Sequence, residues 1–118
     1  MTKAEVNAYI HDTYDVEPSY LWKKDPEDYT FRHKGNNKWF GLIMTVERRR
    51  LGTDEDGLTD ILNVKADPDF ISMVTQSRGY YPGYHMNKQH WLTVCLDGSV
   101  PDDQIMELID TSFDRTKK

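Results

Sequence analysis

The segment from Tyr84 to Trp91, YHMNKQHW, concentrates side chains that can bind an anion or an extended ligand. The chain has no Asp or Glu between Asp69 and Asp97, although its net charge is −5. Imidazole, ammonium and carboxamide groups supply hydrogen-bond donors suited to phosphates and base edges. Two interpretations of this segment stay open: its side chains contact a ligand, or Asn87 and Lys88 form a polar turn while Trp91 packs in the core and His85 satisfies a buried backbone group. The candidates for ligand contacts are Arg78, His85, Asn87, Lys88, His90 and Trp91.

A second cationic cluster, Arg48, Arg49 and Arg50, lies in the polar stretch 47–57 between two expected strands. At the tip of a hairpin such a cluster can reach phosphates, as the wing of a DNA-binding protein does. The alternative is a solvated loop whose charge is neutralised by the acidic residues at 54–56. The sequence leaves both interpretations open.

Metal and nucleophile chemistry have weaker support. His85 and His90 are five residues apart, so they share neither a helix face nor a strand face, and His11 and His33 are remote. Cys95 stands in the apolar run LTVCL, which favours a buried, inert thiol. We expect no metal site, no cofactor and no thiol catalysis.

Other catalytic signatures are also missing from the sequence. The chain has neither a phosphate-cradling glycine loop nor a Gly-x-Ser-x-Gly elbow. Its neighbouring carboxylates fall in expected loops or on polar helix faces, where solvated charge is the usual role. These carboxylates are the run Asp54-Glu55-Asp56, the pair Asp102 and Asp103, and the pair Glu107 and Asp110. The expectation is a protein that is not an enzyme.

Size and composition indicate one soluble globular domain over residues 1–118, with 37% hydrophobic and 30% charged residues. The α+β class follows from the order of the expected elements given below. No apolar run approaches the roughly 20 residues that span a bilayer, and residues 1–5 lack an apolar signal core. We expect a cytoplasmic location and no membrane partner. The single cysteine excludes an internal disulfide. The sequence leaves the oligomeric state open and is compatible with a monomer.

The N-terminal half is expected to contain one helix and four strands. Thr2 and Glu5 match a capping box, so a helix should span residues 3–14. Period-two patterns and turn residues predict strands at 20–22, 29–33, 38–46 and 58–65, with a turn at 23–28. In the strand 38–46, simple alternation places one set of residues on a common face: Phe40, Leu42, Met44 and Val46.

The C-terminal half is expected to contain two helices and one strand. Asp67-Pro68 predicts the start of a helix that Gly79 closes, with an apolar face formed by Phe70, Ile71 and Val74. Residues 80–87 should be irregular or an edge element, and 90–96 a strand. A capping-box pattern at 99–102 precedes an amphipathic helix whose apolar residues are Ile105, Leu108, Ile109 and Phe113. The order α-β-β-β-β-α-β-α favours a two-layer sandwich with an antiparallel sheet.

The motif of the C-terminal half resembles the MmcQ/YjbR family. The matching positions are Tyr84, His85, Asn87, Lys88, His90, Trp91, Asp97-Gly98-Ser99, Pro101-Asp102, Ile105, Leu108, Asp110 and Ser112. The Trp39-Phe40 strand and the helix beginning at Asp67-Pro68 are also similar to the family. The resemblance implies a fold of the frataxin (CyaY) type and a DNA-binding role through a double wing of hairpins.

We therefore expect a small, non-enzymatic binding domain that engages double-stranded DNA. Phosphate contacts would come from residues 48–50, Arg78 and Lys88, while Asn87 and His90 would contact bases or orient the loop. The alternative is a module that binds a protein or a small anionic ligand in a pocket lined by residues 85–91. The acidic balance of the chain requires the cations to gather on one face if DNA is the partner.

Overall fold

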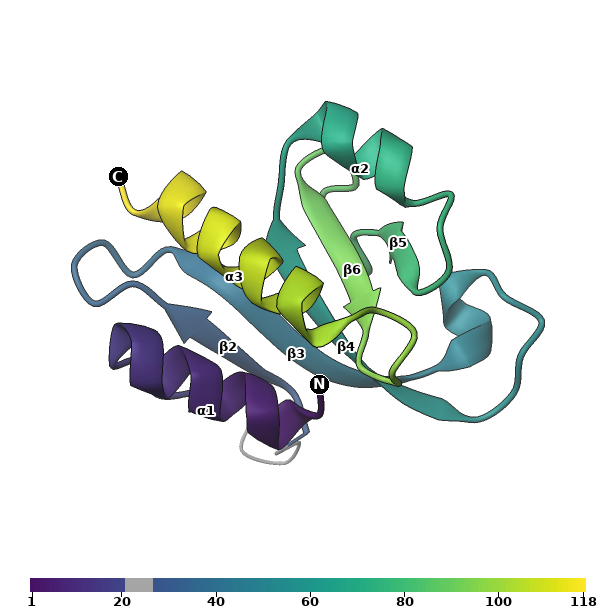
Figure 1. The fold of residues 1–118 in the computed structure, drawn as a ribbon, viewed down its shortest axis with the longest axis horizontal. Coiled ribbons are helices and arrows are strands. Elements are labelled where there is room, and N and C mark those ends of the chain that lie inside the picture. Colours follow the sequence, from purple (N-terminus) through teal and green to yellow (C-terminus); the bar gives the residue numbers. More distant parts are fainter. Residues whose placement is uncertain (21–26) are drawn as a thin grey trace.

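A six-stranded antiparallel sheet in the order β1-β2-β3-β4-β6-β5 forms the centre of the computed structural model, which describes residues 1–20 and 27–118 (Figure 1). The elements are α1 (Lys3–Tyr14), β1 (Ser19–Tyr20), β2 (Tyr29–Arg32), β3 (Trp39–Glu47), the 3₁₀ helix η1 (Arg48–Leu51), β4 (Leu58–Lys65), α2 (Pro68–Val74), β5 (Tyr80–Pro82), β6 (Trp91–Cys95) and α3 (Asp102–Thr116). The predicted α+β class and antiparallel sheet are confirmed. The expected turn 23–28 and the end of the expected strand 20–22 fall largely outside the described residues.

The first helix begins and ends where the sequence indicates. The backbone amide of Glu5 donates to Thr2 Oγ1 at 3.2 Å, and the amide of Thr2 donates to Glu5 Oε1 at 2.9 Å, so the predicted capping box is present. Asp15 closes the helix with a left-handed φ of 57°. Val6 and Ile10 are fully buried and fix α1 against the sheet.

A bulge in β3 overturns the predicted common face of that strand. Phe31 pairs with Gly41 but Arg32 pairs with Trp39, so Phe40 is the extra residue between them. The Phe40 ring therefore turns towards the helices and lies 5.0 Å from the ring of Phe113 on α3. Leu42, Met44 and Val46 remain on the opposite face of the sheet, as alternation requires.

The helix α3 is hydrogen-bonded directly into the sheet next to this bulge. Ser112 Oγ donates to the carbonyl of Phe40 on β3 at 2.6 Å and accepts from the amide of Lys65 on β4 at 2.8 Å. A side-chain hydroxyl thus joins two strands beyond the last residue pair of their ladder, Leu42 with Asn63. Ser112 is fully buried, so its hydroxyl is satisfied by these protein groups rather than by solvent.

Asp110, two residues earlier in the family pattern, joins α3 to α1. Its carboxylate accepts from the hydroxyl of Tyr9 at 2.8 Å and from the hydroxyl of Tyr14 at 2.5 Å. Burial and the bond to Asp110 raise the pKa of Tyr14, so this hydroxyl stays protonated and donates. Tyr14 also stacks on Phe113 with ring centroids 3.9 Å apart.

The helix α2 starts as predicted but is shorter than expected. Asp67 Oδ1 accepts from the amide of Asp69 at 2.9 Å, with Pro68 in the first turn. The helix ends at Val74, so the prediction that Gly79 closes it is wrong. Gly79 instead has φ +90°, and a Cβ there would lie 2.5 Å from Ser99 Oγ. Its role is the close approach of two loops.

The predicted capping box at residues 99–102 is also wrong. Pro101 is the N-cap of α3 and makes no side-chain hydrogen bond. Ser99 Oγ donates backwards to Asp97 Oδ1 at 2.5 Å, in a turn where Gly98 has φ +89°. The Ser99 hydroxyl is therefore hydrogen-bonded to Asp97 and does not cap the helix.

All three helices pack into one core on the same side of the sheet. Strand residues that face this core include Ile43, Leu62 and Val94. Residues of the opposite parity face away from the helices, and among them Val46, Ile61 and Cys95 form a smaller buried cluster. We call this helix-free side the second face. In the described part of the chain, no helix has the length and apolar character needed to cross a membrane.

Candidate functional site

The second face is partly covered by η1 and by the segment that follows β5. Leu51 from η1 and the rings of Tyr81 and Tyr84 pack against the buried cluster on this face. The cationic hairpin tip and the family signature, which are about 40 residues apart in the sequence, therefore meet over the same strands. This meeting point is the candidate functional site.

A buried polar pair in the sheet anchors the signature segment. The backbone amide of Tyr84 donates to Thr93 Oγ1 at 2.8 Å, and Asn63 Nδ2 donates to the Tyr84 carbonyl at 3.5 Å. Thr93 Oγ1 in turn donates to Asn63 Oδ1. Both side chains are fully buried, so they hold the loop in place through direct hydrogen bonds rather than through water. The sequence signal that could have identified this pair is a polar residue in the middle of each strand, Asn63 in β4 and Thr93 in β6. Neither residue was predicted as part of the site.

Two signature residues shape the turn. Asn87 Oδ1 accepts from the amides of Gln89 at 2.9 Å and His90 at 3.1 Å, so its carboxamide oxygen is occupied. Lys88 Nζ donates to the Gly83 carbonyl at 3.0 Å, which closes the loop across its base. Asn87 therefore orients the loop, which was one of its two expected roles. Lys88 supports the loop and still brings its positive charge to the surface.

The aromatic end of the signature is structural. Trp91 is 8% exposed and lies beside Lys65, whose Nζ is 5.3 Å from the ring centroid. His85 is exposed, has a left-handed φ of 58°, and stacks on Tyr84 with ring centroids 4.1 Å apart. His90 is exposed at the end of the turn. Of these, only the two histidines present their rings to solvent.

The three arginines of η1 differ in their partners. Arg48 Nη1 lies 2.9 Å from Asp97 and 3.7 Å from Glu55, and Arg49 Nε lies 2.6 Å from Asp56. Local neutralisation, one of the two interpretations, therefore holds for these two. Arg50 is exposed and makes no ion pair with any described residue. Arg78 is exposed in the turn after α2 and is not part of the same site.

Arg50 and Lys88 line the same pocket of about 280 Å³ on the second face. The other lining residues are Leu51, Gly52, Tyr81, Pro82 and Tyr84. We call this the Arg50–Lys88 pocket. Two cationic side chains and two phenol rings around a small cavity suit an anionic ligand with a planar group. Leu51, Gly52 and Tyr81 are site residues that the sequence did not predict, because only the fold brings them to the signature.

Asp97 fixes one end of η1 to the sheet. Burial alone would raise the pKa of its carboxyl, but hydrogen bonds from Ser99 and Arg48 outweigh burial and hold the pKa at about 2. The folded pKa is below the value of about 3.9 for an unfolded aspartate. The carboxylate therefore stabilises the fold above about pH 4, and this contribution is lost as the pH falls towards 2.

The Asp97→Asn variant tests this linkage. We expect it to reduce the free energy of unfolding by about 1–2 kcal/mol near neutral pH, because the amide cannot form the ion pair with Arg48. The difference between the variant and the unmodified protein should shrink as the pH is lowered from about 4 to about 2. Urea unfolding at several pH values measures it, and Asp56→Asn, at the exposed pair with Arg49, is the control. A difference independent of pH would contradict the assignment.

Thiol and metal chemistry find no support in the described residues. Cys95 is 2% exposed, and burial raises the pKa of its thiol to about 11, so the reactive thiolate is disfavoured. Among residues 1–20 and 27–118, no group of three or more His, Cys, Asp or Glu side chains is placed to hold a metal ion.

Comparisons with known proteins agree with the motif. A family model described as YjbR matches residues 11–115. The Bacillus subtilis protein YyaQ, described as uncharacterised, is 38% identical over 117 residues and 99% of each chain. The Escherichia coli protein YjbR, also described as uncharacterised, is 40% identical over 75 residues, which are 63% of this chain and 55% of that protein.

Solved structures show the same fold. A crystal structure of a Pseudomonas syringae protein superposes with a TM-score of 0.94 at 35% identity, covering 98% of this chain and 99% of that one. A Deinococcus radiodurans protein superposes with a TM-score of 0.75 at 25% identity, covering 99% of this chain and 79% of that one. Together with the family match over most of its length, these similarities show that the chain belongs to the YjbR family.

Proposed function

We propose that this protein is a non-enzymatic binding domain whose Arg50–Lys88 pocket binds a small anionic ligand that carries a planar ring. The observation that supports this proposal most directly is that Arg50 makes no ion pair with a described residue and lines the same cavity as Lys88. An arginine without a carboxylate partner offers five donors to an anion, and a nearby ammonium adds a second positive charge.

The ring of the ligand is inferred from the aromatic lining. Tyr81 and Tyr84 both border the cavity, and His85 stacks on the Tyr84 ring. The stack with His85 and the hydrogen bonds to the Tyr84 backbone hold Tyr84 in place before a ligand arrives. A preformed aromatic wall beside two cations favours a ligand such as a nucleoside phosphate over a bare anion.

The charge arrangement favours this proposal over the double-stranded DNA hypothesis. A duplex binder needs several cations free to meet phosphates along a groove. Here Arg48 and Arg49 are paired with carboxylates, and the Asn87 oxygen, one of the expected base contacts, is occupied by the turn. One unpaired arginine beside one lysine matches a single phosphate group better than an extended backbone.

The proposal is tested by thermal shift with a nucleoside monophosphate, its parent nucleoside and inorganic phosphate. We expect the monophosphate to raise the melting temperature most, because it alone combines the anion with the ring. Arg50→Ala should weaken binding about fivefold, since the exposed phosphate contact contributes up to about 1 kcal/mol. Arg49→Ala is the matched control, because its side chain is already paired with Asp56.

Equal effects of the two arginine substitutions, or no shift with any of the three compounds, would refute the proposal. Binding to duplex DNA that falls steeply with salt and is reduced equally by both substitutions would restore the DNA hypothesis. Fluorescence anisotropy with a labelled duplex measures that outcome directly.

A further inference from the structure

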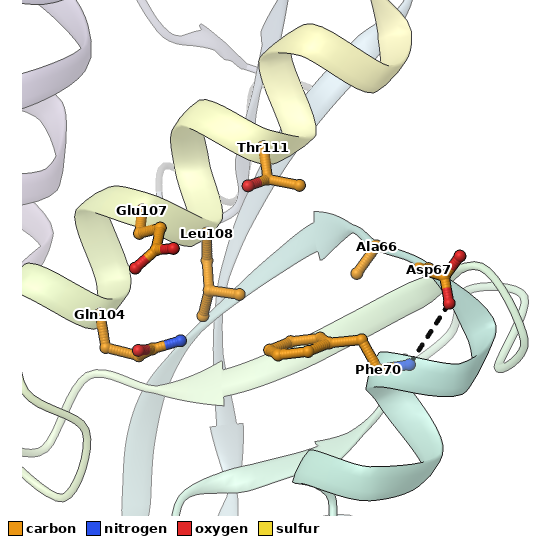
Figure 2. A pocket seen from close by; sticks show the side chains of 7 residues that line it. All are labelled: Ala66, Asp67, Phe70, Gln104, Glu107, Leu108 and Thr111. Atoms are coloured by element: carbon orange, nitrogen blue, oxygen red, sulfur yellow. Dashed lines mark hydrogen bonds between the residues drawn. The ribbon is translucent and has the colours of Figure 1, made fainter.

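A second cavity, of about 270 Å³, lies between α2 and α3 on the helix-covered side of the sheet (Figure 2). Its apolar wall consists of Ala66, Phe70 and Leu108. Figure 2 shows the Phe70 ring extending from α2 beneath Leu108 of α3, with the Gln104 amide at the far end of the ring. The cavity is thus a slot between two helices, bordered by one aromatic ring.

The rim of this slot is acidic. Asp67 borders it at the start of α2 and Glu107 borders it on α3. None of the described residues that line the slot is basic, and Glu107 makes no ion pair within the described part of the chain. One oxygen of Asp67 caps α2 through the amides of Asp69 and Phe70, so its carboxylate is held in place. An apolar slot with two carboxylates at its mouth is complementary to a positive charge on an apolar body.

We infer that this slot binds a small organic ammonium compound with an aromatic or alkyl body. The body would occupy the space against Phe70 and Leu108, and the ammonium group would lie at the rim near Glu107. The hydroxyl of Thr111 and the amide of Gln104 also border the slot and supply polar contacts. A cation near the Phe70 ring gains further from its π face.

The inference is independent of the Arg50–Lys88 pocket. The slot is lined by residues of α2 and α3 and by the two residues between β4 and α2, whereas that pocket is lined by residues 50–52 and by residues of the segment 81–88. The two sites share no lining residue and prefer ligands of opposite charge. A negative binding result for one pocket therefore does not contradict the proposal for the other.

The test uses phenethylammonium, with phenethyl alcohol and hydrocinnamate as its neutral and anionic matches, against the unmodified protein. We expect phenethylammonium to raise the melting temperature and to shift the backbone amide NMR signals of residues 66–70 and 104–111. The alcohol should bind about threefold more weakly, and hydrocinnamate more weakly still, because exposed ion pairs have effects of this size.

Two variants locate the binding. Thr111→Phe, at an exposed lining position on α3, should fill the slot and abolish the shifts. Glu107→Gln should weaken phenethylammonium binding about threefold, while Asp103→Asn, which changes a carboxylate on the same helix outside the slot, should leave it unchanged. Equal binding of all three compounds, undiminished binding by Thr111→Phe, or no binding at all would overturn the inference.

Discussion

Replacing Ser112 with alanine is expected to lower the free energy of unfolding by about 3 kcal/mol. The hydroxyl makes two hydrogen bonds at once, donating to the Phe40 carbonyl at 2.6 Å and accepting from the Lys65 amide at 2.8 Å. Its loss leaves the buried Phe40 carbonyl and the partly buried Lys65 amide without these partners, and an unpaired buried polar group costs about 1–3 kcal/mol. Ser112 and Phe40 are fully buried and Lys65 is partly buried, so the larger share of the cost should come from the Phe40 carbonyl.

Urea unfolding followed by tryptophan fluorescence measures the effect, and Thr111→Ala on the same helix is the control. Thr111 is exposed, so its substitution should change stability by less than about 0.5 kcal/mol. An equally small change for Ser112→Ala would show that this hydroxyl does not join β3 to β4.

Replacing Thr93 with valine is expected to cost about 2–3 kcal/mol and to loosen the signature segment. The two side chains have nearly the same shape, so the change removes the hydroxyl with little effect on packing. The Tyr84 amide loses its acceptor at 2.8 Å, and Asn63 loses the hydrogen bond from Thr93. The first loss leaves a partly buried amide unpaired, and the second removes a partner from the fully buried Asn63 oxygen.

The matched variant Thr93→Ser retains the hydroxyl and loses one methyl group, so it should be destabilised less than the valine variant. Hydrogen exchange at the Tyr84 amide separates a local effect from a global one. We expect much faster exchange in Thr93→Val than in Thr93→Ser at equal temperature. Equal exchange in the two variants would contradict the anchoring role of the hydroxyl.

Local patterns predicted most of the elements because they depend on nearby residues. The capping box of Thr2 and Glu5 and the Asp67-Pro68 helix start each involve contacts within three residues, and both are present. The strand at 58–65 also follows from alternation, and of the two alternatives for residues 80–87, irregular or an edge element, residues 80–82 form an edge strand. Features that depend on such local contacts can be predicted from the sequence alone.

The failures have in common a competing contact that local patterns do not contain. Ser99 would have capped α3, but Asp97 binds it in a tight turn. Phe40 leaves its expected face because β2 and β3 pair with a bulge, which lets its ring join the aromatic side chains of α1 and α3. Such outcomes depend on pairing register and on tertiary packing, which one sequence does not reveal.

For the candidate site, the sequence singled out two segments that the fold brings together, but it could not separate the roles of their residues. Asn87 and Trp91 mainly hold the loop and the sheet together, whereas Arg50 and Lys88 line a cavity. Three consecutive arginines look equivalent in the sequence, yet the position of Asp97 and the acidic residues of the hairpin leave only Arg50 unpaired among the described partners. The distinction requires the fold.

The measurement that tests the central claim most directly is a backbone amide NMR titration of the unmodified protein with a nucleoside monophosphate. Binding in the Arg50–Lys88 pocket predicts that the largest shifts cluster at residues 50–52 and 81–88 and that they saturate with one site per chain. Shifts confined to other surfaces, or none up to millimolar ligand, would contradict the proposal that this pocket is the binding site.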